Sequence, residues 1–123
     1  MAVDVEAELV QFIAGLDGVA HAGVDVPARV EQRLPFVAVR LLPGSEWSPT
    51  WQGPAGHLLQ SVDIDLFTRG VEGVGLARSL RSHLSTMNVR GLVPHACPPL
   101  SRRPDHNEHV RVLGAVFDFI VRT

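Results

Sequence analysis

The sequence has little cysteine: Cys97 is the single one among 123 residues. One cysteine cannot form an intramolecular disulfide, which argues against a small secreted disulfide scaffold and suits a reducing compartment. The first residues carry Asp4, Glu6 and Glu8 where a signal peptide would be basic. No apolar run approaches the roughly 18 residues that a membrane-spanning helix needs. We therefore expect a cytoplasmic protein without a membrane segment.

The sequence also lacks an excess of charge of either sign. Its 11 basic and 13 acidic residues give a formal net charge of -2. Proteins that hold nucleic acid tightly normally show a clear basic excess, so we expect no specific binding of DNA, although DNA can still pass nearby. The apolar content of 46% is ordinary for a globular protein, and the length suits one hydrophobic core. These values predict one domain over residues 1–123.

Two segments have the periodicity of amphipathic helices. The first covers about residues 4–16, with Asp4 placed as its N-cap. The second covers residues 70–87, and glycines weaken its first turn. In this second helix Arg78 and Arg81 would face water. The residues expected on its buried side are Val74, Ala77, Leu80 and Leu84.

Short runs rich in β-branched residues, or with alternating apolar and polar residues, predict strands. They lie at residues 19–26, 34–42, 57–68, 92–96 and 108–122. We expect a loop at residues 44–56 and a polar connection at residues 98–107. Strands joined mainly by loops favour antiparallel pairing. The fold class predicted is therefore α+β, a mostly antiparallel β-sheet with the two amphipathic helices packed on one face.

Histidines near Cys97 raise the question of a metal site. The best candidate is His95-x-Cys97 followed by His106-x-x-His109. Imidazole and thiolate are usual zinc ligands, but this spacing matches no recurring zinc module. As a nucleophile, Cys97 has no histidine in a diagnostic context. We expect no catalytic residues, no metal and no cofactor, and keep as an alternative a small metal-dependent enzyme using this region.

Two other pairs of residues stand out. Asp63 and Asp65 share one face of the strand at residues 57–68, about 7 Å apart by the strand rise. Solvated acids on an open sheet face are the ordinary interpretation of that pattern. Trp47 and Trp51 lie in the loop at residues 44–56. Large aromatic residues on an irregular segment often anchor a protein interface, and their alternative role is a lid over the core.

Four segments together carry a resemblance to a known family. They are Val5-x-x-x-Leu9, Arg33-Leu34-Pro35-Phe36-Val37-x-Val39, Val62-Asp63-Ile64-Asp65-Leu66, and Leu76-Ala77-Arg78-Ser79-Leu80-Arg81, followed by a final strand. In order and length these elements resemble the tail-terminator proteins of long-tailed, siphovirus-type bacteriophages. The resemblance covers nearly the whole chain as one tail-terminator-like domain.

The resemblance implies a virion structural protein that is not an enzyme and needs no cofactor. Such proteins form a ring, expected to be hexameric, that caps the tail tube and ends its polymerisation. The implied partners are further copies of the chain, the tail-tube protein and the head-completion or connector protein, and DNA passes through the lumen. The implied location is the tail and neck of the virion, after assembly in the host cytoplasm. A head–tail connector or head-completion subunit, a stopper or adaptor, is the alternative within the same structural class.

On this resemblance several residues acquire expected roles. A closed ring needs head-to-tail contacts, which loops and strand edges can supply. We therefore expect Trp47, Trp51, Arg102 and Arg103 at interfaces with neighbouring subunits or the tube. Asp63 and Asp65 would face the lumen, where carboxylates repel passing DNA phosphates.

Overall fold

The computed structural model describes residues 4–42, 57–89 and 91–122. Within these ranges the chain forms two α-helices, two short 3-10 helices and one six-stranded sheet. In chain order the elements are α1 (Val5–Ala14), β1 (His21–Gly23), η1 (Val30–Gln32), β2 (Phe36–Leu41), β3 (His57–Thr68), η2 (Gly70–Glu72), α2 (Gly73–Ser85), β4 (Leu92–Ala96), β5 (Ser101–Asn107) and β6 (Val110–Arg122). The predicted α+β class is confirmed.

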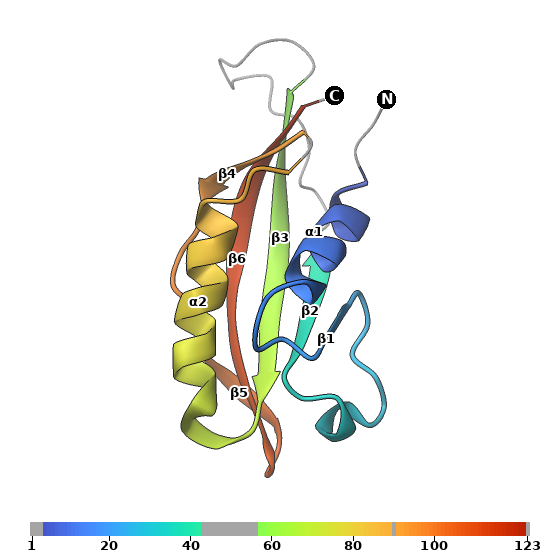
Figure 1. Ribbon diagram of the computed structural model, residues 1–123, viewed down its shortest axis with the longest axis vertical. Helices are drawn as coiled ribbons and strands as arrows, with labels where there is room; N and C mark the ends of the chain where they lie inside the picture. The colour runs from blue at the N-terminus through green and yellow to red at the C-terminus, as the bar shows by residue number, and fades with distance from the viewer. Residues whose placement is uncertain (1–3, 43–56, 90, 123) are drawn as a thin grey trace.

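Two long antiparallel strands, β3 and β6, form the centre of the sheet (Figure 1). β2 pairs antiparallel with β3, and the short β1 pairs with β2 in parallel. On the far side, β4 and β5 both pair antiparallel with β6. β4 lies along the C-terminal part of β6 and β5 along its N-terminal part. The sheet is therefore mixed but mostly antiparallel, as the sequence predicts.

The first helix begins where its capping residue places it. The Asp4 carboxylate accepts a hydrogen bond from the Ala7 backbone N–H at 3.1 Å, which satisfies a donor that the first turn would leave unpaired. Glu6 and Glu8 stand in that turn, where the positive end of the helix dipole favours acids. One side of the helix is buried, through Val5, Leu9 and Ile13.

The second helix follows β3 through a tight turn. Gly70 has a φ of 66°, a left-handed conformation that other residues rarely adopt. The first turn is the 3-10 helix η2, consistent with the expectation that glycines weaken it. Ala77, Leu80 and Leu84 are buried as predicted. Val74 is not: 51% of it is exposed, because it stands at the edge of the helix's contact with the sheet.

Both helices lie against the same face of the sheet (Figure 1). Alternate residues of the central strands point toward them and form the main core. The strand residues in this core are Val37, Val39, Val62, Ile64, Leu66, Leu92, Ala115, Phe117, Phe119 and Val121. The molecule is therefore a two-layer structure, and the predicted packing of both helices on one face is confirmed.

A smaller apolar cluster lies on the opposite face. It gathers the ends of β2, β3 and β6 under the segment between β1 and β2. Its buried members are Val30, Phe36, Ala38, Phe67, Val110 and Val112. We call the face that carries this cluster the open face, because neither α1 nor α2 covers it and only the segment with the short η1 lies over one end. The rest of the open face is polar or partly exposed.

Two sequence-based predictions of strands need correction. The polar connection expected at residues 98–107 contains a strand, β5, since its backbone pairs with β6 although its side chains are mostly exposed and one is a proline. The strand expected at residues 19–26 is reduced to three residues, His21–Gly23. By contrast, β3 has the predicted bounds. The loop expected at residues 44–56 lies outside the described residues.

Candidate functional site

A charged cluster of Asp63, Asp65 and Arg103 lies in the middle of the open face. The two acids come from β3 and the arginine from β5. Their neighbours along β3, Ile64 and Leu66, point into the core, so the alternation of a strand sends the acids to the other side. The shared face predicted for the two acids is confirmed.

The arginine is shared by both carboxylates. Arg103 Nη1 donates to Asp63 Oδ1 and to Asp65 Oδ1, each at 2.7 Å. All three side chains are largely enclosed, with 30% of the arginine and 25% of each acid exposed. Short, charge-assisted hydrogen bonds in such partial burial are stronger than surface ion pairs. The cluster therefore ties β5 to β3, although these strands are not neighbours in the sheet.

A glycine makes this contact possible. β6 runs between β3 and β5, and its residue beside Asp65 is Gly114, which also pairs with Ser101 of β5. A Cβ at position 114 would collide with Asp65 Oδ1 and lie 2.8 Å from Arg103 Nε. Only a residue without a side chain lets the guanidinium pass over β6. Position 114 therefore requires glycine, because the side chains of Asp65 and Arg103 occupy the space that a Cβ would fill.

The proton affinities of the cluster follow from two anions competing for one cation. Burial raises the pKa of Asp65, and the neighbouring Asp63 charge adds to this, against the opposing attraction of Arg103. Partial burial acts to lower the pKa of Arg103, but its hydrogen bonds and charge interactions with the two acids outweigh that and raise it. The arginine therefore remains charged, while Asp65 is the member of the cluster whose charged form is disfavoured by burial.

The other residues predicted at interfaces lie in different settings. Arg102 is adjacent to Arg103 on β5 but exposed, and it pairs with Asp105 at 3.2 Å. Trp47 and Trp51 lie outside the described residues. Arg103 is engaged within its own chain. The interface roles of these four residues, and the lumen-facing role of Asp63 and Asp65, remain predictions.

The candidate metal ligands fall into two separate groups. Ala96, between His95 and Cys97, pairs with Asp118 of β6, whereas Asn107, between His106 and His109, pairs with Val110. Eight residues of strand separate these positions, which is roughly 25 Å. Among the described residues no group of three or more His, Cys, Asp or Glu side chains could hold a metal ion.

One residue of each candidate group, Cys97 and His106, is at least partly enclosed by the fold or packed against another side chain. Burial raises the pKa of the Cys97 thiol, an effect that the Arg81 charge partly opposes. A thiol with a raised pKa is mostly protonated at neutral pH and is a weak nucleophile. The His106 ring packs edge-on against Phe67, with ring centroids 5.7 Å apart. The surroundings of Cys97 and His106 are therefore those of side chains that serve in packing.

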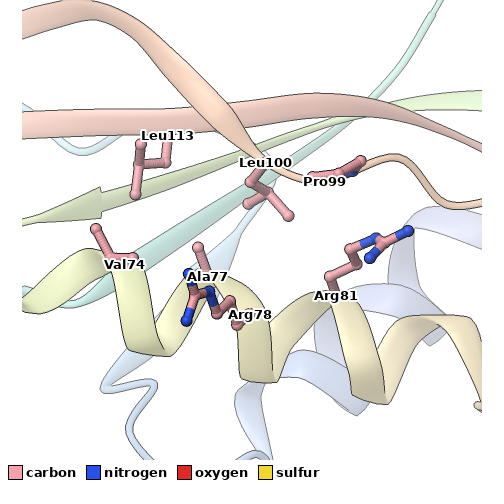
Figure 2. A pocket seen from close by; sticks show the side chains of 7 residues that line it. All are labelled: Val74, Ala77, Arg78, Arg81, Pro99, Leu100 and Leu113. Atoms are coloured by element: carbon pink, nitrogen blue, oxygen red, sulfur yellow. The ribbon is translucent and has the colours of Figure 1, made fainter.

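Sequence reasoning missed a groove between α2 and the sheet, which we call the α2 groove. Its volume is about 480 Å³. Figure 2 shows Val74 and Ala77 of α2 pointing toward Leu100, in the segment before β5, and toward Leu113 of β6. Five lining residues are apolar and two are arginines; none is acidic. They are Val74, Ala77, Arg78, Arg81, Pro99, Leu100 and Leu113.

One hydrogen bond shapes the groove. Arg81 Nε donates to the backbone carbonyl oxygen of Cys97 at 2.7 Å, which holds the segment before β5 against α2. Arg78 stands one turn of helix earlier, and its side chain is exposed. The available signal in the sequence was the helical spacing of Val74, Arg78 and Arg81, but only the fold brings Leu100 and Leu113 opposite them.

Comparisons with protein-family models, with curated proteins and with solved structures found no match. Neither described helix has the length and apolar character that crossing a membrane requires.

Proposed function

We propose that this chain is a virion structural subunit of the tail-terminator type. Copies of it would form a ring, expected to be hexameric, on the end of the phage tail tube. The ring would end tube polymerisation and join the tail to the head-completion complex. Its location would be the tail and neck of the virion.

One observation carries the proposal. The four segments that resemble tail terminators fall in or directly before α1, β2, β3 and α2, which together with β6 contribute most of the main core. The resemblance therefore concerns the elements that determine the fold. The open face gives further support, since its charged cluster has neither α1 nor α2 over it, as a surface along a passage for DNA would.

The charged cluster modifies the expected role of the lumen-facing acids. Arg103 offsets one of the two negative charges on Asp63 and Asp65. Repulsion of DNA phosphates by this patch would therefore be weaker than two free carboxylates provide. On this proposal the cluster makes the wall of the passage polar and non-adhesive.

The test is capping of tail tubes. Purified protein is added to tail-tube protein of the same phage during polymerisation, and tube lengths are measured by electron microscopy. We expect shorter tubes, each with a ring at one end. Unchanged lengths with bare ends would reject the proposal.

A second measurement separates the terminator from the connector alternative. Tails made without heads and heads made without tails are each isolated, and the chain is sought in both. Presence on headless tails supports the terminator, whereas presence on filled heads alone supports a head-completion subunit. Stoichiometric zinc or iron in the purified protein would instead revive the enzyme alternative.

A further inference from the structure

The two α-helices carry opposite charge. α1 has Glu6 and Glu8 in its first turn, follows the capping Asp4, and contains no basic residue. α2 contains Arg78, Arg81 and His83 and no acidic residue, and the acidic Glu72 stands outside it at the N-cap position. Each helix therefore presents a patch of one sign on the same layer of the molecule.

The sheet places these helices toward opposite edges. α1 contacts β1 and β2, whereas α2 contacts β3, β4 and β6 (Figure 1). β1 lies at one edge of the sheet, and β4 and β5 lie at the other. When two copies meet side by side in the same orientation, the acidic helix of one therefore faces the basic helix of the next. A two-fold contact through α2 alone would bring arginines together, which charge repulsion disfavours.

The α2 groove has the apolar and basic side chains that could bind the acidic helix of a neighbouring copy. Its floor is apolar and its two charged lining residues are arginines. On α1, Glu8 and Phe12 are one helical turn apart and both are partly exposed; the buried part of Phe12 packs against the chain's own core, which leaves its exposed part for a neighbour. An aromatic ring suits the floor, and the carboxylate suits the guanidinium of Arg78.

We infer that α1 of one copy docks in the α2 groove of the next copy, as a head-to-tail contact between identical chains. The contact repeats around a closed ring or along an open filament, depending on its rotation. As the joint within a tail-terminator ring it rests on the proposed function, but the contact itself requires only this chain.

Two charge reversals test the contact. Glu8→Arg changes the α1 patch and Arg78→Glu changes the α2 groove. Each variant alone should weaken self-association about tenfold, as sedimentation velocity at low salt measures. A mixture of the two should recover, because the arginine at position 8 of one variant meets the glutamate at position 78 of the other.

The control pair applies the same charge changes elsewhere. Asp25→Arg and Arg29→Glu alter exposed residues in the segment between β1 and β2. They should leave self-association unchanged. A mixture of the two test variants that associates no better than either alone would overturn the inference, as would an equal loss in the controls.

Disulfide capture decides the matter if association is weak. In a Cys97→Ser background, one copy carries Gln11→Cys on α1 and another carries Val74→Cys at the α2 groove, both at exposed positions. We expect mixed dimers well above the dimers that either variant forms with itself. Without that excess the inference fails, even for a chain that caps tail tubes. Capture without capping would instead reject the proposed function and retain the contact.

Discussion

The two faces of the sheet are held by different means. The face under the helices is a continuous apolar core to which both helices and the four strands β2, β3, β4 and β6 contribute. The open face has an apolar cluster at one end and, beside it, three charged side chains that meet over one glycine. Many non-directional apolar contacts stabilise the first face. The second face depends on a few directional hydrogen bonds between specific charged groups.

This difference predicts how each face responds to substitution. In the apolar core the cost should follow the volume removed, because dispersion and burial add over many neighbours. On the open face the cost should depend on which partner is left unpaired. The four predictions that follow test this contrast by equilibrium unfolding in urea.

The largest effect is expected in the core. Phe117 is fully buried on the helix side of β6. Phe117→Ala should reduce the free energy of unfolding by about 3–5 kcal/mol through lost burial and a cavity. Val116→Ala, at the neighbouring residue on the open face, is the control and should cost under about 0.5 kcal/mol. Similar costs at both positions would contradict the contrast between the faces.

The next effect is expected at the glycine of the open face. Gly114→Ala should cost about 1–3 kcal/mol, because the added methyl group collides with Asp65 and crowds Arg103. Gly75→Ala is the matched control: nothing stands within 4 Å of its Cβ position on α2, so alanine should stabilise the helix. Tolerance of alanine at position 114 would show that the cluster is not tightly held.

Removal of the shared cation should have a smaller effect. Arg103→Met leaves two partly buried carboxylates side by side and should cost about 1–2 kcal/mol. Adding Asp65→Asn to that variant should restore part of the loss, since one repelling charge is gone. Arg102→Met, which removes an exposed pair, should cost under about 0.5 kcal/mol. Equal losses at positions 102 and 103 would mean that burial of the cluster contributes nothing.

The smallest effect is a dependence on pH. Because the pKa of Asp65 is raised in the folded state, the folded chain holds this proton more tightly than the unfolded chain does. As pH rises from the ordinary aspartate value of 3.8 through the raised pKa, stability should fall relative to Asp65→Asn. The difference should then stay constant to neutral pH. If stability relative to Asp65→Asn instead rose with pH, the attraction of Arg103 would outweigh the effect of burial on the pKa of Asp65.

Periodicity predicted the covered face well and the open face poorly. The bounds of β3 and the burial of Ala77, Leu80 and Leu84 on α2 follow from local alternation and helical spacing. The charged cluster joins residues 38 and 40 positions apart, and no local pattern encodes such a contact. β5 was missed for a related reason, because its polar, proline-containing sequence forms a strand only through the backbone of β6. Val74 was assigned to the core because helical spacing does not show where the sheet beneath a helix ends.

The position of β6 in the chain has a consequence for folding. β6 pairs with β3, β4 and β5, all of which precede it. On the ribosome, the edges of β3, β4 and β5 that pair with β6 therefore remain open until β6 has emerged. Long-range antiparallel pairing of this kind slows folding and leaves strand edges open to wrong partners meanwhile. The time between synthesis of β3 and synthesis of β6 is thus when a nascent copy is most exposed to aggregation, and when a chaperone would protect it most.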